Sequence, residues 1–186
     1  PYTTLFRSIY RSIDGGASWT RMKAYSYKTD VAITANGVVY ATLSSEAPQK
    51  GIWRSVDGIT WVKITPTGFP TTYGRIVVGI APSDPNQVYF LAAETDNFGL
   101  SSTNFQKDVE WNSFWKYTYN SGDGSGAGGT WSDRSLNLPN QGGDFGQFNT
   151  QGGYDLYVKV KPDDPNVVFL GVANLWRSTD GFTSNN

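Results

Sequence analysis

The chain has 186 residues, a formal net charge of −1, and neither histidine nor cysteine. These absences exclude a Ser-His-Asp or Cys-His catalytic group, a disulfide framework and a thiolate metal site built from this chain alone, and we predict no metal and no cofactor. The chain has no excess of Lys and Arg over Asp and Glu that would favour binding to nucleic acid or to an anionic membrane. No apolar run approaches the ~18 residues that a helix needs to span a bilayer.

The first eight residues, Pro1 to Ser8, correspond to the translation of a common short-read sequencing adaptor. We therefore expect residues 1–8 to be an artefact and exclude them from the fold, as for any processing or cloning scar. The remaining residues, 9–186, are predicted to be a fragment of one domain.

A seven-residue string occurs three times, starting at Ile9, Ile52 and Leu175, and reads aliphatic, aromatic, Arg, Ser, any residue, Asp, Gly. The alternation before the Asp predicts a strand. The Asp-Gly pair predicts a turn, because Gly accepts a positive φ and Asp bonds backbone amides further along the chain. We predict a turn-forming rather than a catalytic role for these aspartates and for the residues around them: Ser12, Asp14, Gly16, Trp19, Ser55, Asp57, Gly58, Trp61, Ser178, Asp180 and Gly181.

Between the first two copies, residues 31–34 and 38–43 flank Asn36-Gly37, a strong signal for a two-residue hairpin. Further on, strands are predicted at 75–80 and 87–93, joined by a Pro-Ser-Asp-Pro-Asn turn at 82–86. The same pattern returns 80 residues later, with Pro-Asp-Asp-Pro-Asn at 162–166. These repeats predict successive antiparallel sheets.

A further strand is predicted at 114–118, where the sequence is similar to the second copy of the string, but a Gly-rich segment at 120–129 replaces its Asp turn. That segment lacks the Lys and the following helix of a phosphate-binding loop. We therefore predict an expanded, flexible turn.

The pattern S-x-D-x-G-x-[ST]-W resembles the Asp-box of sialidases, sortilin-type proteins, xyloglucan-cleaving glucanases and photosystem II assembly factors. The first copy matches in full, the second is one residue shorter, and the third lacks its Trp. The resemblance implies an all-β fold, a partial β-propeller of about four four-stranded antiparallel blades at about 9–25, 30–66, 74–136 and 154–186. It also implies a bacterial extracellular or cell-surface protein, whose propeller needs further blades to close.

In such blades the Asp-boxes and the Pro-Asp-Pro-Asn turns share one face, so the long insertions 94–113 and 135–153 are predicted to lie on the other. Long loops on a rigid scaffold are common sites of binding and catalysis. The ligand-binding candidates are Trp111, Tyr154, Arg75 and Phe145, and the carboxylates that could act as a catalytic pair are Asp144 and Asp155. Structural alternatives are carboxylates that cap loops or are solvated, and aromatic rings that pack between blades.

Two functions compete. The favoured one is an extracytoplasmic binding or scaffold module that recognises a carbohydrate or a protein on the face of the two insertions. The alternative is part of a xyloglucanase-like glycoside hydrolase with paired carboxylates. A sialidase fits poorly, because that family uses three arginines near the propeller axis, and outside the boxes and residues 1–8 only Arg75 is well placed here.

Overall fold

In the computed structural model, residues 8–104 and 106–185 are described, and of Asp144 and Phe145 the backbone alone. All but the last residue of the proposed adaptor segment therefore lies outside the described residues. The predicted all-β class is confirmed: antiparallel strands build the described part, beside short 3-10 turns and a single turn of helix, α1 (Gly143–Gly146).

The first two sheets follow the order of the chain. The first contains β1 (Ile9–Arg11) and β2 (Thr20–Lys23), and the second contains β3 (Thr29–Ile33), β4 (Val39–Leu43), β5 (Gly51–Ser55) and β6 (Val62–Lys63). A hairpin joins β3 to β4 at the position that Asn36-Gly37 predicted, but its loop has three residues, 35–37, rather than two: the Thr34 N–H donates to the Val38 carbonyl and the Gly37 N–H to the Thr34 carbonyl, both at 2.9 Å. Gly37 alone in this loop is left-handed, with φ +84°, as expected for the last residue of a three-residue hairpin loop rather than for a two-residue turn, where Asn36 would also have positive φ.

The third and fourth sheets are also meanders. The third contains β7 (Ile76–Ile80), β8 (Gln87–Ala93), β10 (Val109–Tyr119) and β11 (Gly129–Asp133), and an additional strand, β9 (Leu100–Thr103), pairs with the start of β10. The fourth contains β12 (Tyr157–Lys161), β13 (Asp164–Gly171) and β14 (Leu175–Ser178). The first Pro-containing turn, 82–86, lies between β7 and β8, whereas the second, 162–166, follows β12 and overlaps the first residues of β13.

The segment 94–113 is not the irregular insertion that we expected, because most of it is a β-hairpin. β9 and the first residues of β10 pair from Leu100↔Asn112 to Thr103↔Val109. The side chain of Asn104 closes this hairpin, since its Oδ1 accepts the N–H groups of Gln106 at 3.0 Å and Asp108 at 2.9 Å. The polar residues 101–104 hid the strand in the sequence.

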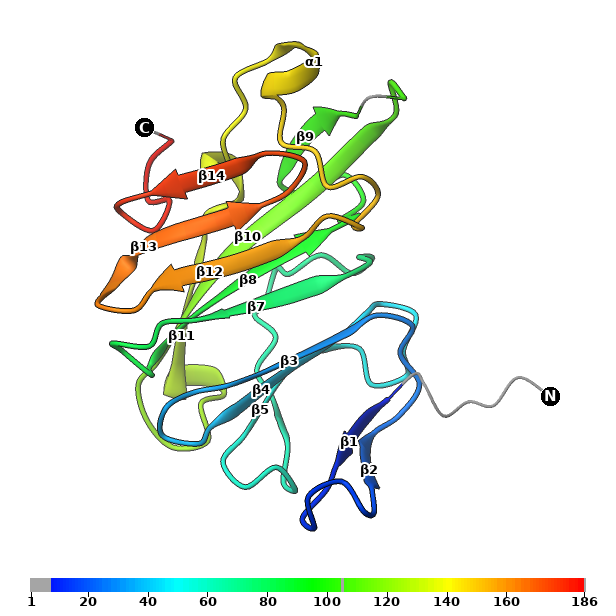
Figure 1. Ribbon diagram of the computed structural model, residues 1–186, viewed down its shortest axis with the longest axis vertical. Coiled ribbons are helices and arrows are strands. Elements are labelled where there is room, and N and C mark those ends of the chain that lie inside the picture. The colour runs from blue at the N-terminus through cyan, green and yellow to red at the C-terminus, as the bar shows by residue number, and fades with distance from the viewer. Residues whose placement is uncertain (1–7, 105, 186) are drawn as a thin grey trace, which may run out of the picture.

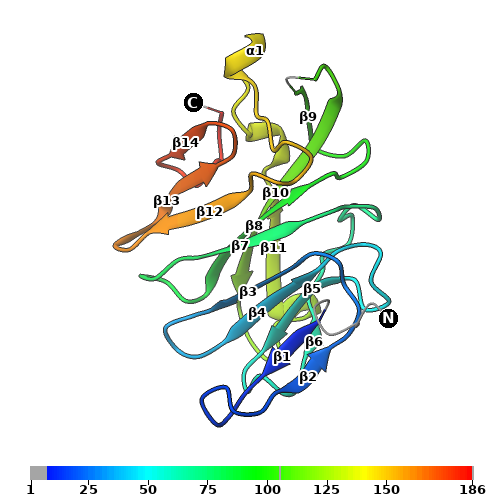
Figure 2. The ribbon, with the colours of Figure 1, turned by 45° about the vertical axis from the view of Figure 1, so that its right-hand side comes forward.

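The four sheets are stacked in chain order, as Figures 1 and 2 show. β3 packs beside β7, and β7 packs beside β12, so the first strands of three sheets are neighbours. Each space between consecutive sheets holds a hydrophobic cluster: one around Ile9 and Leu43, one around Tyr40 and Phe90, and one around Leu91 and Leu170. The burial of apolar area between sheets, rather than within one central core, stabilises the molecule.

The ends of the strands form two opposite faces of the stack, which we name after the turns or loops that they carry (Figure 1). The turn face carries the hairpin turns after β1, β3, β5, β7, β10 and β12 and the turn after β14. The loop face carries residues 24–28, 44–50, 72–75, 94–99 and 149–155. Backbone hydrogen bonds hold each set together, for example Gly181 N–H to Asn166 O on the turn face and Gly74 N–H to Ala93 O on the loop face.

Candidate functional site

On the turn face, the first Asp turn is closed by its own side chains. Asp14 Oδ1 accepts the Ser12 hydroxyl at 2.7 Å and the Ser18 N–H at 2.9 Å, and its Oδ2 accepts the Ser18 hydroxyl at 2.5 Å. The Gly16 N–H donates to Ser12 Oγ at 2.8 Å, and Trp19 Nε1 donates to the Gly16 carbonyl at 3.0 Å. The hydrogen bonds of the Asp14 carboxylate thus go to residues of its own turn.

The second turn makes the same network with one residue fewer. Asp57 Oδ1 accepts the N–H groups of Ile59 at 2.8 Å and Thr60 at 2.7 Å, and the Gly58 N–H donates to Ser55 Oγ at 2.8 Å. The backbone donors Ile59 and Thr60 lower the pKa of Asp57 from 3.8 to about 2. In the first turn, Gly15 lies between Asp14 and the glycine whose N–H donates to the Ser hydroxyl, whereas in the second turn that glycine, Gly58, follows Asp57 directly. The residue that the second turn lacks is therefore the one at the position of Gly15.

The turn after β14 shows that a Trp is not required for this network. Asp180 accepts the hydroxyls of Ser178 at 2.6 Å and Ser184 at 2.7 Å, and both bonds lower its pKa, that of Ser178 most. Phe182 stands where the first copy has Gly16, with φ +59° and a side chain buried in the core between the last two sheets.

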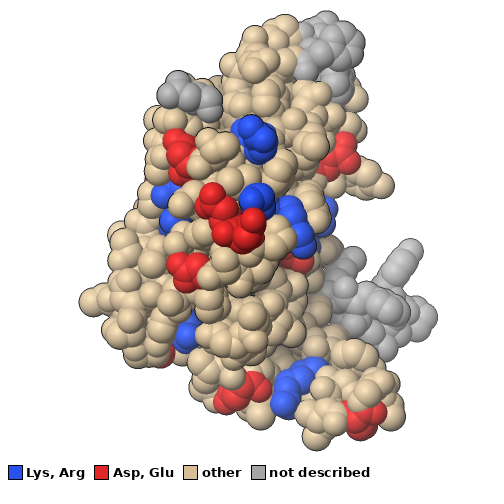
Figure 3. All heavy atoms as spheres, turned by 60° about the vertical axis from the view of Figure 1, so that its left-hand side comes forward, with Lys and Arg blue, Asp and Glu red and all other residues tan. Residues whose placement is uncertain are grey.

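The Gly-rich turn at 120–128 keeps an Asp-Gly pair, which the sequence interpretation passed over. Asp123 Oδ1 accepts the N–H of Ser125 at 2.8 Å and its hydroxyl at 2.7 Å. Every one of these aspartates is therefore engaged with neighbouring backbone. Acidic and basic side chains are interspersed over this side of the molecule (Figure 3), so it presents no large field of one sign.

The candidate site is a cleft of about 390 Å³ on the loop face, between the β9–β10 hairpin and the segment 149–153. Its lining combines carboxylates, amide and hydroxyl groups and one aromatic ring: Glu94, Asp96, Asn104, Asp108, Val109, Glu110, Trp111, Thr150 and Gly152. A second pocket, about 290 Å³ in volume, lies between the last two sheets. We choose the loop-face cleft because several carboxylates line it, whereas the lining of the pocket between the last two sheets contains none.

Glu110 anchors the cleft. Its side chain is buried and accepts four hydrogen bonds: from Thr150 N at 2.9 Å, Thr150 Oγ1 at 3.0 Å, Gly152 N at 2.8 Å and Asn104 Nδ2 at 3.2 Å. A buried carboxylate requires such donors to offset the loss of hydration. Glu110 thereby ties the hairpin to a segment 40 residues further along the chain.

Glu94 forms the second wall of the cleft, at the end of β8. Its carboxylate forms an ion pair with Lys28 from the linker before β3, and it lies against Gly74, where a Cβ would collide with it. Glu94 has φ +58°, which is uncommon for a residue other than glycine. Strained backbone of this kind is concentrated at functional sites, which supports this cleft as one.

Trp111 lies on β10 opposite Ser101 of β9, and its side chain is half-buried at the cleft wall. The carboxylates of Asp96 and Asp108 are exposed at the rim. Together these groups offer an aromatic surface beside hydrogen-bond acceptors, which suits a ligand with both apolar faces and hydroxyl groups.

The other predicted residues lie beside the cleft rather than in it. Arg75 Nη1 donates to the Tyr154 carbonyl at 3.2 Å, so Arg75 braces the segment next to the cleft. The Tyr154 ring is 81% exposed, and Asp155 is half-buried with its N–H bonded to the Thr150 carbonyl. Neither residue lines the cleft.

The remaining two predicted residues, Asp144 and Phe145, belong to α1, and their side chains lie outside the described residues. The proposed carboxylate pair of Asp144 and Asp155 therefore stays a prediction. Of the sequence candidates, Trp111 is the one that the structure places in the cleft wall.

Glu94, Asp96, Asp108 and Glu110 belong to the insertion 94–113, but none of them was among the candidates named from the sequence, and Asn104 and Thr150 were missed as well. The signal for Glu110 was present: in the strand pattern Val-Glu-Trp-Asn-Ser-Phe it shares a side with Asn112 and Phe114, which are fully buried. A Glu at an inward strand position predicts a buried carboxylate with donors around it.

Within the described ranges, no three His, Cys, Asp or Glu side chains are grouped so that they could hold a metal ion. The same ranges contain no helix that is long and apolar enough to cross a membrane. The chain was also compared with known proteins: no family model matches it, and no curated protein matches it either.

Proposed function

We propose that this chain is part of an Asp-box β-propeller, at about 9–25, 30–66, 74–136 and 154–186, and that it binds carbohydrate in the loop-face cleft. Four antiparallel meanders stacked in chain order, with the first strands of three of them adjacent, support the propeller. The Asp-centred hydrogen bonds of the turns after β1, β5 and β14 support the Asp-box resemblance.

The observation that carries carbohydrate binding is the position of Trp111 beside the cleft carboxylates. Sugar rings stack on aromatic faces through their C–H groups, while their hydroxyls donate to carboxylates and amides. The volume of about 390 Å³ falls within the range of small-molecule sites, which is roughly 300–1,000 Å³. The ligand would meet both insertions, 94–113 and 135–153.

Binding without catalysis is the better supported of the two functions. Glu110, the buried carboxylate of the cleft, is engaged by four donors, and Glu94 is paired with Lys28. A general acid or base needs a carboxylate that is both available to a substrate proton and held in position, and the two remaining carboxylates of the cleft, Asp96 and Asp108, lie exposed at its rim. The proposed bacterial, extracellular or cell-surface location is supported by the Asp-box resemblance alone.

The test is a glycan array followed by calorimetric titration of the best neutral oligosaccharide, with an assay for reducing ends run beside it. Trp111→Ala is expected to weaken binding at least tenfold, because stacking on the ring is lost. Trp19→Ala is the matched control, an exposed Trp on the turn face.

Equal affinity of both variants would contradict the cleft as the site. The release of reducing ends would instead support a glycoside hydrolase. Binding to no glycan would overturn the carbohydrate proposal and leave a protein as the partner of this face.

A further inference from the structure

A second polar pocket adjoins the loop-face cleft at the β9–β10 hairpin. Its volume is about 300 Å³, and hydroxyl, amide and backbone groups make up most of its lining: Ser101, Ser102, Thr103, Val109, Asn140, Gly142 and Gln147. Val109 lines both this pocket and the cleft, and it is 64% exposed. We call the second pocket the edge pocket, because three of its residues belong to β9, which pairs with β10 on one side only.

The backbone of β9 presents unpaired groups to the edge pocket. Antiparallel strands bond each other at alternate residues, and in this hairpin the N–H of Asn104 is one that donates to the opposite strand. The N–H and C=O groups of Ser101 and Thr103 therefore point away from β10. Within the described ranges, the N–H of Thr103 donates to Gln147 Oε1, whereas the N–H and C=O of Ser101 have no partner.

One face of the hairpin connects the cleft to the edge pocket. Trp111 is paired across the strands with Ser101, and side chains paired in this way share a face of the sheet. Trp111 lines the cleft, and Ser101 lines the edge pocket. A ligand that stacks on Trp111 can therefore continue over Ser101 into the edge pocket along a single surface.

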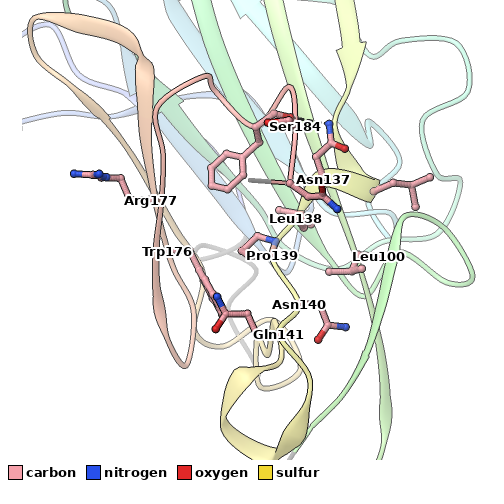
Figure 4. A pocket seen from close by; sticks show the side chains of 12 residues that line it. Leu100, Asn137, Leu138, Pro139, Asn140, Gln141, Trp176, Arg177 and Ser184 are labelled. Atoms are coloured by element: carbon pink, nitrogen blue, oxygen red, sulfur yellow. Dashed lines mark hydrogen bonds between the residues drawn. The ribbon is translucent and has the colours of Figure 1, made fainter.

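The far wall of the edge pocket is the segment that precedes α1. The Gly142 N–H donates to Asn140 Oδ1 at 3.1 Å, and the Nδ2 group of Asn140 has no partner among the described residues. Figure 4 shows Asn140 extending toward the strand that carries Leu100, whereas Gln141 extends toward Trp176. The wall thus offers an amide donor opposite the free edge of β9.

The chemistry of the edge pocket differs from that of the cleft. Among the described residues that line it there is no Asp, Glu, Lys or Arg. Its amide, hydroxyl and backbone groups both donate and accept hydrogen bonds, as sugar hydroxyls do. A uronic acid or a phosphate group would lose hydration here without meeting a cation, so the edge pocket suits a neutral sugar unit.

A free strand edge can also pair with an added peptide strand. β9 has four residues, and of the two that point outward, Thr103 already gives its N–H to Gln147. An added strand would find a complete pair of donor and acceptor only at Ser101. A sugar needs no such ladder of backbone bonds, and the remaining groups favour it as the occupant.

The spacing of the strands gives the length of the ligand. Neighbouring strands lie about 4.8 Å apart, which is about the length of one pyranose unit. One unit on Trp111, a second over Ser101 and a third in the edge pocket make three.

We propose that the edge pocket is a second sugar subsite, and that the ligand is a neutral oligosaccharide of three or more units that runs from Trp111 across β9 to Asn140. This inference rests on the carbohydrate binding proposed for the cleft. It adds the length and the lack of charge of the ligand, and it assigns Ser101 and Asn140 to the binding surface.

The test is calorimetric titration with neutral, unbranched oligosaccharides of two to six units, in the glucose, mannose, xylose and N-acetylglucosamine series. In a series that binds, the affinity is expected to rise about tenfold between two and four units and then to level off, because the hydrogen bonds of the edge pocket are added. Asn140→Ala is expected to weaken binding of the tetrasaccharide about fivefold and to leave that of the disaccharide unchanged.

Gln106→Ala is the matched control, because it removes an exposed amide of the same hairpin that lines neither pocket. This variant is expected to bind both lengths as the wild type does. Circular dichroism of each variant checks that the fold is retained.

A second measurement needs no substitution. Hydrogen exchange of the Ser101 amide, followed by NMR, is expected to slow in the presence of the tetrasaccharide and not of the disaccharide, whereas the indole signal of Trp111 shifts with both. An affinity that levels off at two units, an equal effect of Asn140→Ala on both lengths, or unchanged exchange at Ser101 would each overturn the subsite and leave the cleft as a carbohydrate site. Binding of no series would overturn the proposed function itself, and the subsite with it.

Discussion

The two faces of this molecule use polar side chains in different ways. On the turn face, carboxylates and hydroxyls bond backbone two to four residues away, as in Ser18 N–H to Asp14 Oδ1 and Thr60 N–H to Asp57 Oδ1. On the loop face they join distant segments, as in Glu110 with Thr150 and Glu94 with Lys28. The first kind of contact builds the scaffold, and the second kind shapes a cleft.

The difference indicates where function can be located. A carboxylate saturated by its own turn has no capacity left for a ligand, even when it is exposed. The loop face instead exposes Asp96 and Asp108 beside Trp111, while Glu110 and Glu94 fix the walls in place through their bonds to Thr150 and Lys28. An exposed Asp on one face and an exposed Asp on the other are therefore not equivalent candidates.

The largest expected effect separates an Asp turn that packs against the preceding sheet, at Gly181, from one that is open, at Gly15. Gly181→Ala is expected to lower the free energy of unfolding by about 3 kcal/mol, because it adds left-handed strain and a collision with Arg134 and Tyr89. Gly15→Ala, at the same position of an open turn, is expected to lose only about 1 kcal/mol. Urea unfolding of both variants makes the comparison, and equal losses would show that the close packing of Arg134 and Tyr89 on Gly181 does not contribute.

On the loop face, Glu110→Gln is expected to lower the free energy of unfolding by about 2 kcal/mol, because an NH₂ group would then face N–H donors. Asp108→Asn is the matched control at the exposed rim, with a change within about 0.5 kcal/mol. Thermal unfolding provides the measurement. If both substitutions had the same small effect, Glu110 would not anchor the cleft.

The turn aspartates predict a dependence of stability on pH. The pKa of Asp57 is lowered from 3.8 to about 2, and those of Asp14 and Asp180 are lowered as well. A lowered pKa in the folded state means that the unfolded state binds protons first, so this stabilisation is complete above the ordinary pKa and is lost as the pH falls through the folded value.

We therefore expect the melting temperature to fall between about pH 4 and pH 2, and to fall less in Asp57→Asn than in wild type. A melting temperature measured at half-unit intervals of pH tests this. Identical pH profiles for the two proteins would show that Asp57 does not contribute.

The smallest expected effect concerns Arg75, which donates one hydrogen bond to the Tyr154 carbonyl. Arg75→Met is expected to cost less than about 1 kcal/mol, since the bond is partly exposed. Hydrogen exchange is expected to accelerate in the segment 151–155 and not in the turn at 120–128. Uniform acceleration across the chain would mean that Arg75 supports the whole sheet rather than this segment.

Local chemistry allowed much of the fold to be predicted from the sequence. The Asn36-Gly37 hairpin, the Pro-containing turns and the all-β class depend on residues a few positions apart, and the structure has these elements near the predicted positions. The hairpin of β9 was missed, because polar residues 101–104 carry a weak strand signal and gain their order by pairing with β10.

By itself the sequence determined the turns, because an Asp and a Ser two residues apart accept backbone N–H groups from the few residues that follow them. Only the tertiary structure decided the cleft and the contact of the last Asp turn with Arg134. Glu110 meets Thr150 across 40 residues, and Arg134 meets Gly181 across 47. Contacts at such separations depend on how the sheets stack, and the stacking is set by apolar packing summed over many side chains, which no single motif encodes.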